Sequence, residues 1–300
     1  MKTALPTRAR RLVDRYRVED GGSFRIKDHD PAETSGLSLR GKAAKRKAQE
    51  ILENGVRLLA DLQLKLYAQD RWGVLVILQA MDAAGKDSTI KHVMSGVNPQ
   101  GVEVSSFKVP TAAELDHDYL WRSVRQLPER GRIGIFDRSY YEEVLVVKVH
   151  PAILRGQKLP PKLVGGKIWS QRYEDINAFE RYLSRNGFLI LKFFLNVSQK
   201  EQKRRFLERL DEPEKNWKFS VQDVKERTFW NDYMRAYQDA IAATSTPWAP
   251  WHVVPADHKW FTRMVVVAAI ISGIEGLDLR SPKLDAARRR ELAAARRALR

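Results

Sequence analysis

The chain has 300 residues, 43% hydrophobic and 30% charged, which excludes a largely disordered protein and allows one large or two small domains. Cysteine is absent, which excludes disulfides and thiolate metal sites and agrees with a cytoplasmic location; no apolar run is long enough to cross a membrane, and no secretory signal is expected. Lys and Arg number 53 against 37 Asp and Glu, and the net charge of +16 favours a polyanionic partner.

The first predicted elements run from an arm into a buried strand. Residues 1–40 lack sustained periodicity, and we expect an extended arm lying over the main domain. A long helix is predicted at about 42–67, where leucines and a valine repeat at helical spacing. Residues 74–78 form a continuous apolar run, which is typical of a parallel strand covered on both faces. A small-residue turn and an amphipathic helix follow.

The same alternation of strands and helices continues to residue 274. Further strands are predicted at 102–107, 133–136, 189–195 and 251–254. Further helices are predicted at 112–126, 164–183, 198–219, 220–241 and 262–274. This order predicts an α/β fold with a parallel sheet and helices on both faces. We expect one domain over 41–280 and a basic tail at 281–300, where seven Lys and Arg face only Asp285 and Glu291.

The turn at residues 81–86 has the features of a phosphate-binding loop. A bound phosphate chain needs inward N–H groups, a positive helix terminus and a lysine that reaches the charge. Gly85 and Lys86, between a strand and a helix, meet these needs. The full Walker A pattern is broken twice, because Ala80 replaces its first glycine and Asp87 its hydroxyl residue. The plainer alternative is a small-residue turn with a surface lysine.

Two aspartates point to a divalent cation. Asp82 lies inside the phosphate turn, where a carboxylate is repelled by phosphate unless a cation lies between them. Asp137 ends the strand at 133–136, which matches the Walker B arrangement. We therefore predict that Asp82 and Asp137 hold Mg²⁺, with Mn²⁺ as a substitute. The alternative for Asp137 is a helix N-cap or a turn residue.

The residues after Asp137 suggest a catalytic cluster. Arg138 is placed to neutralise charge on a transferred phosphoryl group. Glu142 or Glu143 is a candidate for orienting an acceptor or a metal-bound water. An equally good explanation for either glutamate is the solvated first turn of a helix.

A basic helix at about 198–219 is predicted to act as a lid over anionic substrate. Its expected apolar seam consists of Phe206, Leu207 and Leu210. Its expected phosphate-binding arginines are Arg204, Arg205 and Arg209. The tip would lie at 211–215, and Lys215 and Lys218 would extend the positive track. A solvated charged helix explains the same composition.

Three segments together, at 78–91, 135–146 and 198–218, resemble the second family of polyphosphate kinases, and the match spans most of 36–274. The resemblance implies a P-loop kinase fold, with Mg²⁺-dependent phosphoryl transfer between inorganic polyphosphate and nucleotides, and favours the subclass that acts on AMP and ADP. It assigns catalysis to Asp82, Lys86, Asp137, Arg138 and Glu142. Nucleotide or polyphosphate contacts are expected from Ala83, Ala84, Gly85, Asp87, Ser88, Thr89, Lys91, Arg204, Arg205, Arg209, Lys215 and Lys218.

The expected partners are inorganic polyphosphate and adenine nucleotides, with guanine nucleotides as further candidates and no membrane or nucleic acid. A homo-oligomer is expected, although core packing explains the apolar stripe at 230–241 as well as a subunit interface does. Two other functions stay open. An ATP-dependent nucleoside monophosphate kinase would use the same turn and lid, and a non-catalytic nucleic-acid-binding protein would use the same charge.

Overall fold

A six-stranded sheet runs through the molecule in the order β1-β6-β5-β2-β4-β3. The computed structural model describes residues 7–37, 41–280 and 285–300. All neighbouring strands are parallel except β1, which pairs antiparallel with β6, so the predicted parallel α/β fold is confirmed. The strands are β1 (Arg17–Val18), β2 (Gly73–Ala80), β3 (Val102–Ser106), β4 (Ile133–Asp137), β5 (Phe188–Asn196) and β6 (Trp251–Pro255).

The apolar run that predicted the first strand forms β2, at the centre of the sheet. Residues 73–79 are all buried, as expected for a strand covered on both faces. β2 pairs with β5 on one side and β4 on the other. Leu78 lies opposite Asp137, so this register places the carboxyl end of β4 beside the turn that leaves β2.

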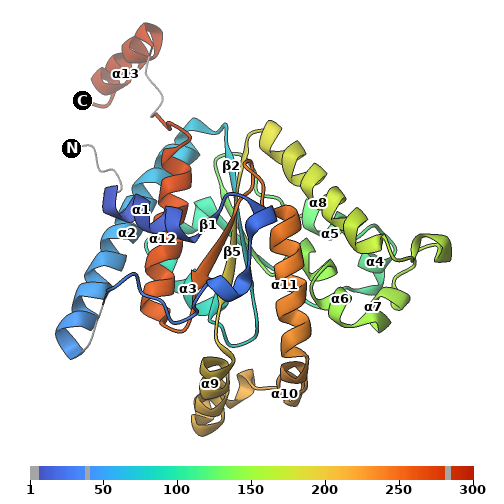
Figure 1. The fold of residues 1–300 in the computed structure, drawn as a ribbon. Helices are drawn as coiled ribbons and strands as arrows, with labels where there is room; N and C mark the ends of the chain where they lie inside the picture. Colours follow the sequence, from blue (N-terminus) through green and yellow to red (C-terminus); the bar gives the residue numbers. More distant parts are fainter. Residues whose placement is uncertain (1–6, 38–40, 281–284) are drawn as a thin grey trace.

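Helices cover both faces of the sheet (Figure 1). α1 (Thr7–Tyr16), α2 (Gly41–Gln69) and α12 (Lys259–Glu275) lie on one side, where α12 packs between α2 and the strands β5 and β6. α8 (Ile168–Arg185) and α11 (Trp230–Thr244) lie on the other side. Tyr233, Tyr237 and Ile241 of α11 are buried in the core. Core packing within one chain therefore accounts for the apolar stripe of this helix.

α9 (Gln199–Asp211) and α10 (Val221–Glu226) extend together beyond one end of the sheet, the lower end in Figure 1. The hydroxyl of Ser198 accepts a hydrogen bond from the Glu201 N–H at 3.1 Å, which is the expected N-cap. The remaining helices of four or more residues are α3 (Lys86–Val93), α4 (Ala112–Leu115), α5 (Trp121–Val124), η4 (Tyr140–Glu143), α6 (Val146–Val149), α7 (Pro151–Gly156), η6 (Pro213–Lys218) and α13 (Ala286–Ala298). No helix in the described ranges is both long and apolar enough to cross a membrane.

Several local predictions were wrong; the helix expected at 198–219, for example, ends at Asp211. The described part of the N-terminal arm is not simply extended, because it contains α1 and the edge strand β1. Tyr16 and Val18 are buried there, so these apolar side chains attach the segment to the domain although many of their sequence neighbours are arginines. The helix predicted at 112–126 is broken into α4 and α5. The Asp118 side chain accepts from the Leu120 N–H at 2.9 Å, a local bond that competes with a continuous helix.

Candidate active site

The turn between β2 and α3 has the backbone geometry of a phosphate cradle. Gly85 is the N-cap of α3 and has φ 106°, a conformation that disfavours any residue with a side chain. Ala83 also has a positive φ of 59°, which is unusual for a residue with a Cβ. The turn thus directs the N–H groups in the first turn of α3, which have no acceptor within the helix, toward the end of the sheet.

Asp137 lies at the end of β4 with a buried carboxylate oxygen, Oδ1, that has no hydrogen-bond partner among the described residues. Burial raises the pKa of Asp137, while the positive charge of Lys86 acts in the opposite direction. Asp82 and Asp87 contribute further negative charge nearby. A carboxylate oxygen that is buried without a hydrogen-bond donor, with two further carboxylates nearby, favours the binding of a cation.

Arg138 bridges the phosphate turn and the segment after β4. Its Nη2 lies 3.3 Å from Asp82 Oδ1, and its Nη1 lies 3.8 Å from Glu142 Oε2. Gln79 donates from Nε2 to Glu142 Oε1 at 2.8 Å, so Glu142 is held from β2 as well. Arg138 has φ 64°, a left-handed backbone that places it just beyond the strand. Asp82, Arg138 and Glu142 are therefore brought together, as expected.

The structure distinguishes the two adjacent glutamates. Glu142 lies at the site, and burial raises its pKa despite the nearby charges of Arg138 and Lys86. Glu143 is instead turned into the protein, where its carboxylate lies 3.3 Å from Arg172 Nη1 and accepts from Gln157 Nε2 at 2.6 Å. Of the two, only Glu142 is placed to act on a substrate.

The predicted residues of α3 lie in three different environments. Lys86 is buried, and its charge reaches both Asp137 and Glu142. Thr89 donates its hydroxyl to the Gly85 carbonyl at 2.9 Å, and Ser88 accepts from Arg263 Nη2 at 2.6 Å, so both hydroxyls stabilise the turn. Asp87 and Lys91 are exposed.

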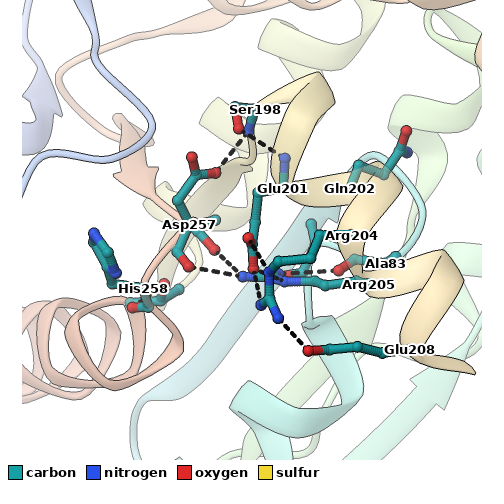
Figure 2. A network of polar contacts seen from close by, with 12 residues as sticks. Ala83, Ser198, Glu201, Gln202, Arg204, Arg205, Glu208, Asp257 and His258 are labelled. Atoms are coloured by element: carbon teal, nitrogen blue, oxygen red, sulfur yellow. Dashed lines mark hydrogen bonds and ion pairs between the residues drawn. The ribbon is translucent and has the colours of Figure 1, made fainter. Parts of the chain in front are cut away.

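Arg205 of α9 lies beneath the phosphate turn (Figure 2). It is only 3% exposed, and its Nη1 donates to the carbonyls of Ala83 and Ala84 at 3.0 and 2.7 Å. Its Nη2 donates to the carbonyls of Ala256 and Asp257 at 2.6 and 3.1 Å. Nε donates to Glu201 at 2.7 Å. One guanidinium therefore ties the phosphate turn to the segment after β6.

This arrangement differs from the expected lid, in which arginines face the substrate. The buried face of α9 consists of Gln202, Arg205 and Phe206. Leu207 and Leu210, expected in an apolar seam, are about half exposed. Gln202 also holds the turn, since its Nε2 donates to the Asp82 carbonyl at 2.9 Å. The first half of α9 is thus a support packed against the phosphate turn.

The other predicted lid residues lie outside this contact. Arg204 is exposed and pairs with Glu201 and Glu208 of its own helix (Figure 2). The Arg209 guanidinium lies 5.5 Å from the centre of the Phe206 ring. The side chains of Lys215 and Lys218 fall outside the described part of the structure, so their predicted role in binding phosphate stays a prediction.

Replacing Arg205 by Lys is expected to destabilise the fold by about 2–4 kcal/mol, because a lysine cannot form the planar fork that reaches several carbonyls at once. Transfer activity should fall as well, since the phosphate turn loses its tie to α9. Chemical denaturation and initial rates would measure both effects. Arg204→Lys is the matched control, and its effect on stability should stay within about 0.5 kcal/mol. Equal effects of the two substitutions would contradict this role for Arg205.

A buried charged cluster supports the segment that carries Arg138 and Glu142. Lys192 Nζ lies 2.6 Å from Glu180 Oε2, and both side chains are 0% exposed. The hydroxyls of Tyr140 and Tyr141 both donate to Glu180 Oε1 at 2.9 Å. Lys192 also donates to the Thr244 carbonyl at 2.7 Å. Since Tyr140 and Tyr141 belong to η4, the cluster fixes η4 to β5, α8 and α11.

Several residues near the site were not predicted. Gln79, Gln202 and Arg263 contact predicted site residues, and each comes from a different element. Burial, and then the negative charge of Asp82, raises the pKa of Asp223 of α10, so the charge of Asp82 reaches this residue as well. Only Gln79, a polar residue inside an apolar strand, carried a signal that sequence reasoning could have used.

Comparisons with known proteins identify the family to which the chain belongs. A family model described as polyphosphate kinase 2 (PPK2) matches residues 42–282. The chain is 52% identical over 250 residues to an ADP-polyphosphate phosphotransferase from Rhodopseudomonas palustris, covering 83% of this chain and 86% of that protein. It is 46% identical to an AMP/ADP-polyphosphate phosphotransferase from Meiothermus ruber, covering 92% and 97%. A crystal structure of polyphosphate kinase 2 from Arthrobacter aurescens aligns with a TM-score of 0.83 and 41% identity, covering 94% and 96%. The chain therefore belongs to the polyphosphate kinase 2 family and is a phosphotransferase.

Proposed function

We propose that this enzyme transfers phosphoryl groups between inorganic polyphosphate and the adenine nucleotides AMP and ADP, with Mg²⁺ as the cofactor. The observation that carries the proposal is the meeting of Asp82, Lys86 and Asp137 at the N-terminus of α3, in a chain of net charge +16. Helix N–H groups and a lysine bind phosphate, while the two carboxylates require a cation between themselves and that phosphate.

The residues present fit a magnesium ion. No group of three or more acidic, histidine or cysteine side chains within the described residues is arranged to hold a metal alone. The unpartnered Oδ1 of Asp137 and the carboxylate of Asp82 would supply two ligands, and phosphate oxygens and water would supply the others. When bound, such an ion would neutralise negative charge on the phosphate groups.

The chain's own residues account for the remaining steps. Lys86 and the first N–H groups of α3 hold the phosphate chain at the turn. Arg138 stabilises the charge that spreads over the transferred group, and its contacts with Asp82 and Glu142 hold it in position. Glu142 orients the acceptor. No covalent intermediate is required, because positioning and charge neutralisation provide most of the catalysis of phosphoryl transfer.

We infer that both AMP and ADP accept the phosphoryl group. The two relatives described above are named for ADP and for AMP with ADP, which supports activity on both nucleotides. We expect ADP and ATP to form when the enzyme receives AMP, polyphosphate and Mg²⁺. Side-by-side rates with AMP, ADP, GMP and GDP would test this range and the activity on guanine nucleotides. Transfer from ATP to AMP or dTMP, with none from polyphosphate, would favour the nucleoside monophosphate kinase alternative.

A further inference from the structure

The C-terminal helix α13 has an exposed surface with an unusual charge. Every residue from Asp285 to Arg300 is exposed, and the helix lies apart from the body of the protein in Figure 1. It also falls beyond residues 42–282, which match the family model, so it is a feature of this chain in addition to the shared domain. Residues 285–300 contain six arginines and only two acidic residues, Asp285 and Glu291.

The arginines of α13 are arranged in rows. Arg289 and Arg296 are seven residues apart, as are Arg290 and Arg297, so each pair lies on one side of the helix with a separation of about 10 Å along its axis. Arg288 pairs with Glu291. Within the described residues, no ion pair connects Arg289, Arg296 or Arg297 to a carboxylate. The helix therefore presents a cationic strip whose charges are not neutralised within the chain.

Such a helix gains little from the rest of the protein. It has no buried residue, and a polar helix of 13 residues is marginally stable alone in water. Like charges that lie close together lower its stability further. A linear polyanion along the strip would neutralise this repulsion, and the planar guanidinium of arginine matches phosphate oxygens well.

We propose that α13 binds the part of a long polyphosphate chain that extends beyond the active site; this inference rests on the proposed function. Polyphosphate fits the strip better than a single-stranded nucleic acid does, because residues 285–300 contain no aromatic side chain on which a base could stack. The strip supplies charge alone, and a phosphate polymer needs nothing else. By holding the polymer near the enzyme, α13 raises the local concentration of donor phosphate at the active site.

The test compares the full chain with a variant carrying Arg289→Gln, Arg296→Gln and Arg297→Gln. Glutamine keeps a good helix propensity, and all three positions are exposed, so the fold should be unaffected. We expect KM for long-chain polyphosphate to rise about fivefold or more at low salt, with kcat unchanged. KM for chains of only a few phosphates should not change, because they do not reach α13. The slope of log Kd for labelled long-chain polyphosphate against log salt should fall by about 2.

The matched control carries Lys162→Gln, Lys167→Gln and Arg185→Gln, three exposed positions elsewhere, and loses the same charge. This control should leave the difference in KM between long and short polyphosphate unchanged. Equal KM increases for both chain lengths, equal effects of the two variants, or a loss of oligonucleotide binding alone would overturn the inference. The binding measurement does not depend on turnover. An enzyme that binds long polyphosphate through α13 but transfers no phosphate would contradict the proposed function and leave this inference intact.

Discussion

Replacing Asp137 by Asn is expected to lower the rate of polyphosphate-dependent transfer by about 10³-fold or more, while the protein stays folded. The substitution keeps the shape of the side chain but removes the charge that a magnesium ion requires. It also removes a buried carboxylate whose Oδ1 has no partner among the described residues, and whose pKa is raised by burial. The thermal midpoint should therefore change little, because the cost of burying this charge and its attraction to Lys86 and Arg138 oppose each other.

Initial rates at saturating substrate, together with thermal unfolding of the same preparations, would measure this separation of activity from stability. Asp61→Asn makes the same chemical change on the exposed surface of α2 and should leave both quantities unchanged. Wild-type rates in the Asp137 variant would show that this carboxylate is not part of the metal site. A large loss of stability would show that its role is structural.

Replacing Lys192 by Met is expected to destabilise the fold by about 3–5 kcal/mol, the largest effect on stability that we predict. The substitution leaves Glu180 fully buried without its cation, although the two tyrosine hydroxyls can still donate to it. Activity should fall too, because the same cluster holds the segment that carries Glu142. Lys158→Met, which removes one partner of the exposed pair with Asp116, is the control and should leave stability nearly unchanged.

The loss in the Lys192 variant should depend on pH in a defined direction. Burial raises the pKa of Glu180, and without the lysine this carboxyl should be protonated in the folded protein. A carboxyl whose pKa is higher in the folded than in the unfolded state favours folding at low pH, and this contribution is lost as pH rises through the folded-state pKa. Denaturant unfolding should therefore show that the variant loses less free energy of unfolding, relative to the wild type, at mildly acidic pH than at neutral pH. A deficit that grows as pH falls would contradict the assignment of this pair.

The sequence was sufficient for the five parallel strands and the phosphate turn, but not for the antiparallel edge strand β1. An apolar run identified β2 because a strand covered on both faces needs apolar residues throughout, and Gly85-Lys86 after it indicated the turn. The proximity of Asp82 and Asp137 followed from topology, since the ends of neighbouring parallel strands meet at one edge. That Glu142 faces the site while Glu143 is turned into the protein could not be predicted, because the two differ only in the phase of a short 3-10 helix.

The contacts that hold the site residues in place could not be predicted from the sequence. Arg205 was expected to face the substrate as part of a lid, because an arginine on a charged helix is usually exposed and not buried. Its burial depends on carbonyl groups from the phosphate turn and from the end of β6, which are distant along the chain. The burial of Lys192 could not be predicted for a similar reason. A lysine inside a buried strand is compatible with the fold only when a partner such as Glu180 comes from another element.

The central claim is that polyphosphate itself supplies the transferred group. The most direct measurement incubates the enzyme with ADP, Mg²⁺ and radiolabelled polyphosphate, and then determines where the label lies in the ATP that forms. We predict label in the γ-phosphate, with no AMP produced in proportion to the ATP. Unlabelled ATP accompanied by an equal amount of AMP would show transfer between two nucleotides, and would contradict the account.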